Sequence, residues 1–384
     1  MTDTTQSAPA FAGVPARLAT PRAGYLFSPW FDFFCLGGGS VLILGLIVLL
    51  LPRGIPTAQE GALIVLLMTL INQPHFAHSY QMFYRNFGAK AFGTQYARGL
   101  RLRYIVAGLV VPAGLILFLG AAVVSRDEHL LSYGANLMFF LVGWHYVKQG
   151  YGILIVDSVQ KRALFSDRAK TIFRLNGYAC WMVAWLALNH ALAKATPYLG
   201  LVYYSFPVPT LLYDVAIAAA SLSTLAALAM FADAWRHGKN GLPWNGVIAY
   251  LTTLYLWLVF VHINPLVLIV VPTFHSLQYL AVVWRYQLNE GAARKLPAAG
   301  VWRNLAVFVI IGMVLGYLGF AGVPRLLDEV LSYDKHLFGP SLCVFVAYIF
   351  INVHHYFLDN VMWRRGNPDV QQYIFTRPAA RPAN

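Results

Sequence analysis

Charged side chains are scarce in this chain, in which Asp, Glu, Lys and Arg make up 11% of 384 residues. Soluble domains contain about 25% charged and about 45–50% apolar residues. Here the apolar share is 59% and the aromatic share is 15%. These proportions exclude an ordinary soluble enzyme, a disordered chain and a low-complexity fibre. They predict a protein that lies largely within a membrane.

Several motifs are also missing. The three cysteines, Cys35, Cys180 and Cys343, show no CxxC spacing, which excludes a disulfide framework and a zinc ribbon. The first 25 residues lack an apolar stretch, so we expect no cleavable signal peptide. The chain has no P-loop and no Rossmann fingerprint, and no loop has room for an electron-transfer domain.

Long apolar segments are what the chain has instead. A membrane span needs roughly 20 mostly apolar residues. Ten segments qualify: 31–51, 61–82, 104–124, 131–156, 173–192, 207–235, 246–262, 266–284, 304–322 and 339–361. The sequence therefore predicts an all-α, polytopic membrane bundle of about ten transmembrane helices. A tail of residues 1–30 precedes this domain (31–361), and a second tail (362–384) follows it.

The basic residues alternate between the predicted loops. Of 28 Lys and Arg residues, 22 fall on one side of the predicted membrane, five on the other, and Lys148 lies inside a span. Cytoplasmic loops carry the excess of Lys and Arg, so both chain ends are expected in the cytoplasm. The net charge of +13 then reflects topology, and we expect a lipid bilayer as partner and no nucleic acid. A bacterial-type inner membrane is the expected location.

Histidines are unusually placed. Five of the eleven lie in predicted loops or near span ends, where water can reach them: His129, His190, His237, His262 and His336. The other six lie inside predicted spans: His75, His78, His145, His275, His354 and His355. Ionisable groups inside a membrane are costly and are functional candidates by default.

Three of these helices share one spacing. Eight residues separate His75, His275 and His354 from an aromatic residue that is followed by Arg, in Tyr84-Arg85, Trp284-Arg285 and Trp363-Arg364. Ten helical residues span about 15 Å, so the three histidines are expected at one depth near the middle of the bilayer. His145 lies at a comparable depth, 12 residues before Asp157.

Helical phase predicts a shared site. Residues three and four positions apart share a helix face, and polar faces in lipid must turn inward. The expected metal ligands are His75, His78, His145, His275, His354, His355 and Asp359, and the expected cofactor-binding or positioning residues are Lys148, Gln149, Gln278 and Tyr356. We favour His355 over His354 because His355 shares a face with Asp359. Pro74 and Pro272 are expected to loosen the helix beside His75 and His275.

Imidazoles with one carboxylate suit iron, copper or zinc. The expected function is a metal-dependent membrane oxidoreductase of the oxygenase or hydroxylase type. It would use mononuclear or dinuclear non-haem iron, with copper or zinc as alternatives, on a lipid or isoprenoid substrate. A separate electron donor is expected where oxygen is reduced. The site loosely resembles that of the membrane desaturases and hydroxylases in residue type and cytoplasmic bias, although their HxxxH and HxxHH motifs are absent.

Three alternatives stay open at this point. A b-type haem protein needs two histidines that face each other across a haem. A proton- or metal-coupled transporter would suit the many spans, the proline-broken helices and the Gly37–Ser40 run in the first span. A buried hydrogen-bond network without metal would also explain membrane-embedded histidines.

Overall fold

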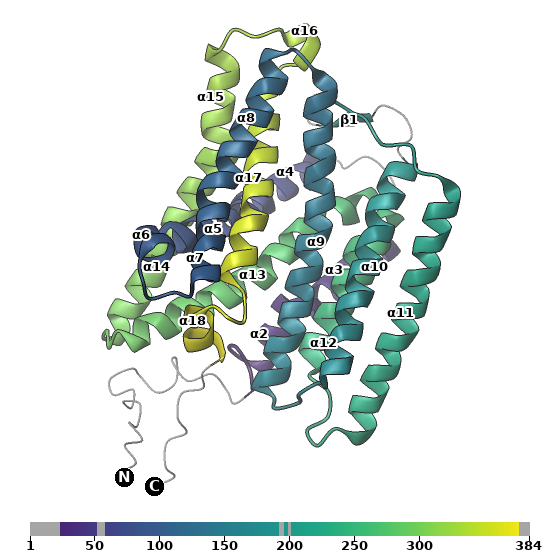
Figure 1. Cartoon of the computed structure of the whole chain (residues 1–384), viewed down its shortest axis with the longest axis vertical. Coiled ribbons are helices and arrows are strands. Elements are labelled where there is room, and N and C mark those ends of the chain that lie inside the picture. Colours follow the sequence, from purple (N-terminus) through teal and green to yellow (C-terminus); the bar gives the residue numbers. More distant parts are fainter. Residues whose placement is uncertain (1–23, 52–57, 192–195, 199–200, 376–384) are drawn as a thin grey trace.

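The structure, a computed structural model, describes residues 24–51, 58–191, 196–198 and 201–375. Regular structure in these ranges is helical apart from one short antiparallel hairpin of β1 (Thr196–Tyr198) and β2 (Leu201–Tyr203). Figure 1 shows the long helices packed side by side as a bundle. The predicted all-α class is therefore confirmed. Most of the predicted tail 1–30 and the end of the tail 362–384 lie outside the described residues.

Within the described residues, six helical stretches are long and apolar enough to cross a membrane, as expected for a multi-pass integral membrane protein. They are Pro29–Leu50, Arg98–Val124, Thr210–His237, Leu266–Ala293, Ala298–Val330 and Leu342–Met362. In element terms they comprise α2 (Pro29–Phe33), η1 (Phe34–Gly38) and α3 (Gly39–Leu50); α7 (Arg98–Ile105), η3 (Val106–Val110) and α8 (Val111–Val124); α11 (Thr210–His237); α13 (Pro265–Ala293); α14 (Ala298–Tyr317), η6 (Leu318–Gly322) and α15 (Val323–Val330); and α17 (Leu342–Met362).

The other four predicted spans are helical as well. They correspond to α4 (Ala58–Leu67) with η2 (Met68–Asn72) and α5 (Gln73–Tyr84), to α9 (Glu128–Gln160), to α10 (Asp167–Ala191), and to α12 (Trp244–Leu251) with η4 (Thr252–Val259). The first three carry polar side chains that face the interior, such as His75 on α5, Gln149 on α9 and Asn176 on α10. Such residues lower the hydropathy of a helix without preventing it from lying in a bundle.

The connections sort by end. The junctions α9–α10, α11–α12 and α13–α14 lie at the lower end of the bundle in Figure 1, together with α18 (Pro368–Val370). The α8–α9 junction, the β hairpin and α16 (Lys335–Phe338) lie at the opposite end. Three of the predicted basic loops, those between α9 and α10, α11 and α12, and α13 and α14, thus share one end with α18.

Prolines within the helices are accommodated by π-helical turns. Three π-helical segments each end two residues before a proline: η2 before Pro74, η3 before Pro112 and η6 before Pro324. Proline lacks an N–H and crowds the carbonyl four residues earlier, and the wider π turn relieves that conflict. The predicted loosening beside His75 thus takes the form of η2, whereas Pro272 lies within α13 without such an interruption.

Close helix packing positions α5. Gly316 of α14 faces the start of α5 so closely that a Cβ there would lie 2.7 Å from the carbonyl carbon of Gln73. Gly312, one turn earlier, faces the ring of His78. Small residues four positions apart allow membrane helices to approach in this way.

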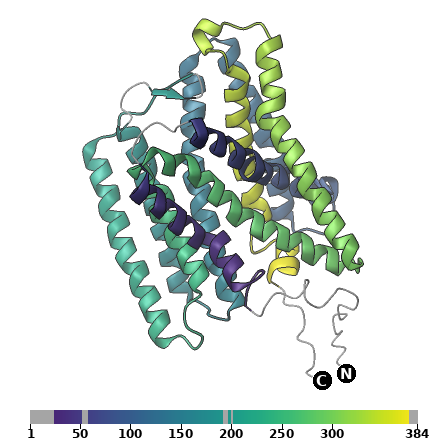
Figure 2. The ribbon, with the colours of Figure 1, turned by 180° about the vertical axis from the view of Figure 1, so that it is seen from behind.

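The helices divide into an interior set and a peripheral set. In the most apolar 18-residue segment of α13, 72% of the residues are buried. The corresponding share is 17% in α11 and 17% in the α14–α15 stretch. Figure 2 shows α13 running obliquely across the bundle, with α3 and α4 beside it and with α11 and α14 at the two edges. Four helices that meet in the interior, α5, α9, α13 and α17, carry the six histidines that were predicted to lie inside spans.

Candidate metal centre

Four histidines from four helices form one closed ring of imidazoles. His75 comes from α5, His145 from α9, His275 from α13 and His355 from α17. The ring centroids are 4.8 Å apart for His75–His355, 4.9 Å for His355–His145, 4.9 Å for His145–His275 and 5.4 Å for His275–His75. All four side chains are buried, with at most 4% of their surface exposed. Four of the predicted ligands, from segments up to 280 residues apart, therefore meet at one point.

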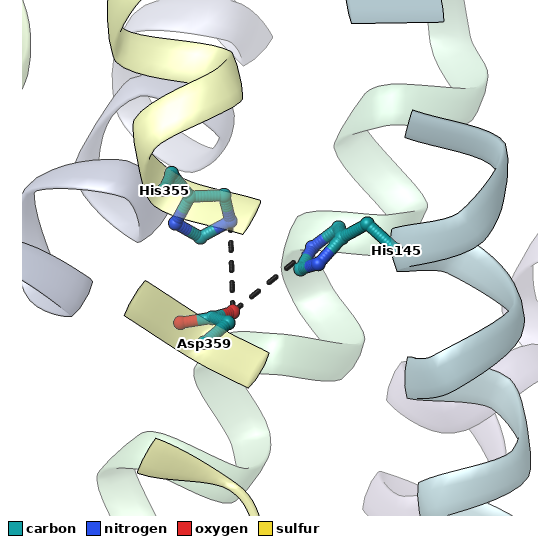
Figure 3. Close-up of side chains that lie close together, drawn as sticks. All are labelled: His145, His355 and Asp359. Carbon is teal, nitrogen blue, oxygen red and sulfur yellow. Dashed lines mark ion pairs between the residues drawn. The ribbon is translucent and has the colours of Figure 1, made fainter. Parts of the chain in front are cut away.

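Asp359 completes the cluster. One turn after His355, it places Oδ2 3.6 Å from His355 Nε2 and 4.0 Å from His145 Nε2. Figure 3 shows the two imidazoles and the carboxylate pointing toward one another. One ligand atom from each of the three lies within 4.8 Å of the other two. On the other side, His145 Nε2 lies 3.1 Å from His275 Nε2.

Several ring nitrogens in the cluster are unpaired. Within the described ranges no hydrogen-bond partner reaches Nε2 of His75, Nδ1 of His275 or either nitrogen of His355. Buried polar atoms are paired in the large majority of cases, and exceptions need an explanation. A bound metal ion supplies one, because it takes the lone pair of a neutral imidazole.

His75 shows how the surroundings prepare such a nitrogen. Its Nδ1 lies 2.5 Å from the Asn72 carbonyl oxygen and 2.8 Å from Ser276 Oγ. A carbonyl oxygen can accept a hydrogen bond but cannot donate one. Nδ1 therefore carries the proton, and Nε2 keeps its lone pair. Histidines that bind metals typically donate their other N–H to a carbonyl or carboxylate in this way.

Asp359 is oriented by two hydroxyl groups. Ser79 donates to Oδ1 at 2.9 Å and Tyr279 at 3.3 Å, and these two hydroxyls lie 2.6 Å from each other. Oδ2 is thereby left facing the histidines. Ser276 and Tyr279 are site residues that the sequence analysis missed. Tyr279 lies one turn after His275, so the same helical spacing points to it, whereas no spacing singles out Ser276.

Aromatic rings cover the cluster. Tyr146 stacks on His275 at a centroid distance of 4.2 Å, and Tyr356 stacks on His145 at 4.8 Å. The hydroxyl of Tyr356 donates to Asn352 at 3.0 Å. These contacts fix the imidazole planes and exclude water from the rings.

The two predicted amide side chains, Gln149 and Gln278, form hydrogen bonds to backbone carbonyls and to each other. Gln149 Nε2 donates to the His275 carbonyl oxygen and to Gln278 Oε1, both at 2.9 Å, and Gln278 Nε2 donates to the Leu36 carbonyl oxygen. They tie α13 to α9 and to η1 and do not contact an imidazole nitrogen in these bonds. Lys148 is exposed on α9, with Nζ 5.5 Å from the ring centre of Trp144.

Two predicted ligands lie outside the cluster. His78 stacks on Phe308 of α14 at 4.3 Å. His354 contacts Tyr80 OH through Nδ1 at 2.9 Å and the Ala107 carbonyl oxygen through Nε2 at 3.0 Å. The expectation that these two histidines join the shared site is therefore corrected. Their positions on the helix turn them toward α14 and η3.

The geometry also bears on the haem alternative. Each imidazole of the ring has two others within 5.4 Å, and Tyr146 and Tyr356 close two of its sides. A haem needs a flat space between its two axial histidines, and this packing leaves none. Within the described residues, His145, His355 and Asp359 form the group whose donor atoms lie close enough together to hold one metal ion.

Comparison of the chain with protein-family models, with curated proteins and with solved structures gave no match.

Proposed function

We propose that this protein is a membrane-embedded, metal-dependent oxidoreductase of the oxygenase or hydroxylase type. The observation that carries the proposal is the ring of four buried imidazoles, contributed by four helices of an apolar bundle, in which His75, His275 and His355 have unpaired nitrogens. Nitrogen donors with a single carboxylate suit non-haem iron best among the metals that activate oxygen, with copper or zinc as alternatives. A non-haem iron bound there would supply the activation of dioxygen.

The residues have distinct roles in this proposal. His75, His145, His275 and His355 hold the metal, and Asp359 is the candidate fifth ligand. The Asn72 carbonyl and Ser276 keep the proton of His75 on Nδ1, and Ser79 and Tyr279 orient Asp359. Hydrogen bonds of this kind, made to a residue that binds a metal, raise its basicity and fix its orientation. His78 and His354 have no part in metal binding.

The position of the site supports our proposal of a lipid substrate. A cleft of about 600 Å³ reaches the cluster, where His145, Asp359 and Tyr356 line it. Because the site lies among apolar helices, we propose an acyl lipid or isoprenoid, and hence a role in lipid metabolism. A dioxygenase, which puts both atoms of O₂ into the substrate, needs no reductant. A hydroxylase, which reduces one of them to water, needs two electrons from a separate donor.

We also propose that ten helices cross the membrane and that both chain ends are cytoplasmic, in a bacterial-type inner membrane. Two observations support this arrangement: all ten predicted segments are helical, and three of the junctions predicted to be basic share one end of the bundle. An excess of Lys and Arg marks the cytoplasmic side.

Elemental analysis of the purified full-length protein tests the metal site. Wild type is expected to hold about one or two equivalents of iron, copper or zinc, and both His75→Ala and His355→Ala are expected to lose them. His237→Ala is the matched control, because His237 is exposed and paired with Asp233. Metal-free wild-type protein with a normal unfolding transition would overturn the proposal. Metal flux into liposomes without substrate oxidation would favour the transporter instead.

A further inference from the structure

The cleft that reaches the cluster has two chemically different ends. It is lined chiefly by α9, α10 and α17 and follows α9 from Trp144 to Val156. Twelve helical residues span about 18 Å. His145 and Asp359 lie at the inner end, and apolar residues such as Ile155 and Val156 line the wall further along.

Basic side chains gather along this cleft. Its lining includes Lys148, Lys170, Arg174, Arg364 and Arg365. The only carboxylates among its lining residues are Asp359, which faces the histidines, and Asp167, which pairs with Lys170 at 3.0 Å. Within the described ranges the remaining four cations form no ion pair with a carboxylate. The cleft therefore carries uncompensated positive charge.

The asymmetry of membrane loops accounts for only part of this charge. Lys170, Arg364 and Arg365 lie near helix ends, where basic residues mark the cytoplasmic side. Lys148 lies 12 residues before the end of α9 at Gln160, about 18 Å along the helix. A cation at that depth is costly unless an anion or water meets it. In the structure its ammonium group lies 5.5 Å from the ring centre of Trp144, and rotation about its long stem would bring it toward the arginines.

We propose that the cleft binds an amphiphile whose anionic head group, a carboxylate or a phosphate, contacts Lys148, Arg174, Arg364 and Arg365. Its apolar chain extends from the head group along α9 toward His145 and Asp359. This inference rests on the proposed function, because it names the substrate class of the same site. Chemistry then falls on the chain and not on the head group.

Tryptophan quenching by brominated lipids tests the proposal directly, because Trp144 and Trp363 line the cleft. The full-length protein is placed in phosphatidylcholine nanodiscs at pH 8 and titrated with 9,10-dibromostearate, the corresponding dibromo-octadecanol and the corresponding dibromo-octadecyl phosphate. The two anionic probes are expected to reach half-maximal quenching at a concentration at least about tenfold below that of the alcohol, because charged hydrogen bonds add to the affinity. The stronger anionic probe identifies the head group.

Two charge-matched variants locate the effect. Arg364→Gln/Arg365→Gln is expected to raise the half-maximal concentration of the anionic probe about tenfold and to leave that of the alcohol unchanged. Arg168→Gln/Arg236→Gln removes the same charge from exposed residues outside the cleft lining, and it is expected to change neither. Lys148→Met tests the inner cation in the same titration.

Equal quenching by the acid, the phosphate and the alcohol overturns the proposal, and so does an equal response of the two double variants. Because the titration does not need the metal, its result is separable from that of the proposed function. Metal-free protein that still selects anionic probes contradicts the metal site alone. Metal-bound protein that does not select them contradicts the head-group site alone.

Discussion

His354 and His355 are neighbours on α17, yet their surroundings differ completely. Both nitrogens of His354 contact protein oxygens, those of Tyr80 and Ala107. Neither nitrogen of His355 has a hydrogen-bond partner among the described residues, and its ring lies beside two other imidazoles, those of His75 and His145, and the carboxylate of Asp359. Both side chains are buried, so burial does not distinguish them. The partners of their ring nitrogens do.

The largest expected effect comes from substituting the two neighbours identically. His355→Leu should abolish metal binding, and the unfolding free energy of its metal-free form should be unchanged or higher, because it removes unpaired buried nitrogens. His354→Leu should keep the metal and lose about 1–3 kcal/mol of unfolding free energy, because it strands Tyr80 OH and the Ala107 carbonyl. Elemental analysis of both variants measures the metal content, and denaturant titration measures the unfolding free energy. Equal loss of metal in both would contradict the proposal that His355 binds the metal and His354 does not.

A smaller effect is expected at Ser276, which contacts His75 from α13. Ser276→Ala should weaken metal binding by about 10–100-fold, since contacts that orient a metal ligand typically have this effect. Competition with a chelator of known affinity measures the change. Ser223→Ala, whose hydroxyl donates to the Ala220 carbonyl on α11, is the control and should leave the metal affinity unaltered. An unchanged affinity in Ser276→Ala would show that the contact does not support the ligand.

The smallest effect concerns packing around His78, the histidine that faces α14. Gly312→Ala should cost about 1–3 kcal/mol of unfolding free energy, because the added Cβ meets the His78 ring, and metal content should be retained. Gly114→Ala is the matched control, since nothing lies within 4 Å of a Cβ built there. Loss of metal in Gly312→Ala, with the fold intact, would show that His78 contributes to metal binding, contrary to our proposal.

Much of the site follows from helical phase alone. Asp359 lies four residues after His355, and this spacing correctly favoured His355 over His354 as its neighbour. The common His-to-Arg spacing predicted that His75, His275 and the His354–His355 pair lie at one depth, and each of these three helices supplies a histidine to the ring. Such periodicities are local properties of a helix, so they can be read before any contact is known.

The same reasoning failed for His78. It shares a stripe with His75, yet the approach of α14 at Gly312 turns it toward a different neighbour. Spacing specifies which residues share a face but not which helix covers that face. Ser276 escaped notice for the same reason, because its role depends on the distance between α5 and α13.

The sequence by itself determined that this chain is an apolar helical bundle and that several histidines lie deep within it. Hydropathy and helical period are properties of a single segment, so they can be read from its sequence without knowing which helices pack against it. Only the tertiary structure decided which imidazoles form the ring, which nitrogens stay unpaired and which cations line the cleft. Those features depend on how helices far apart in the chain pack together, and that packing is a property of pairs of helices rather than of any one of them.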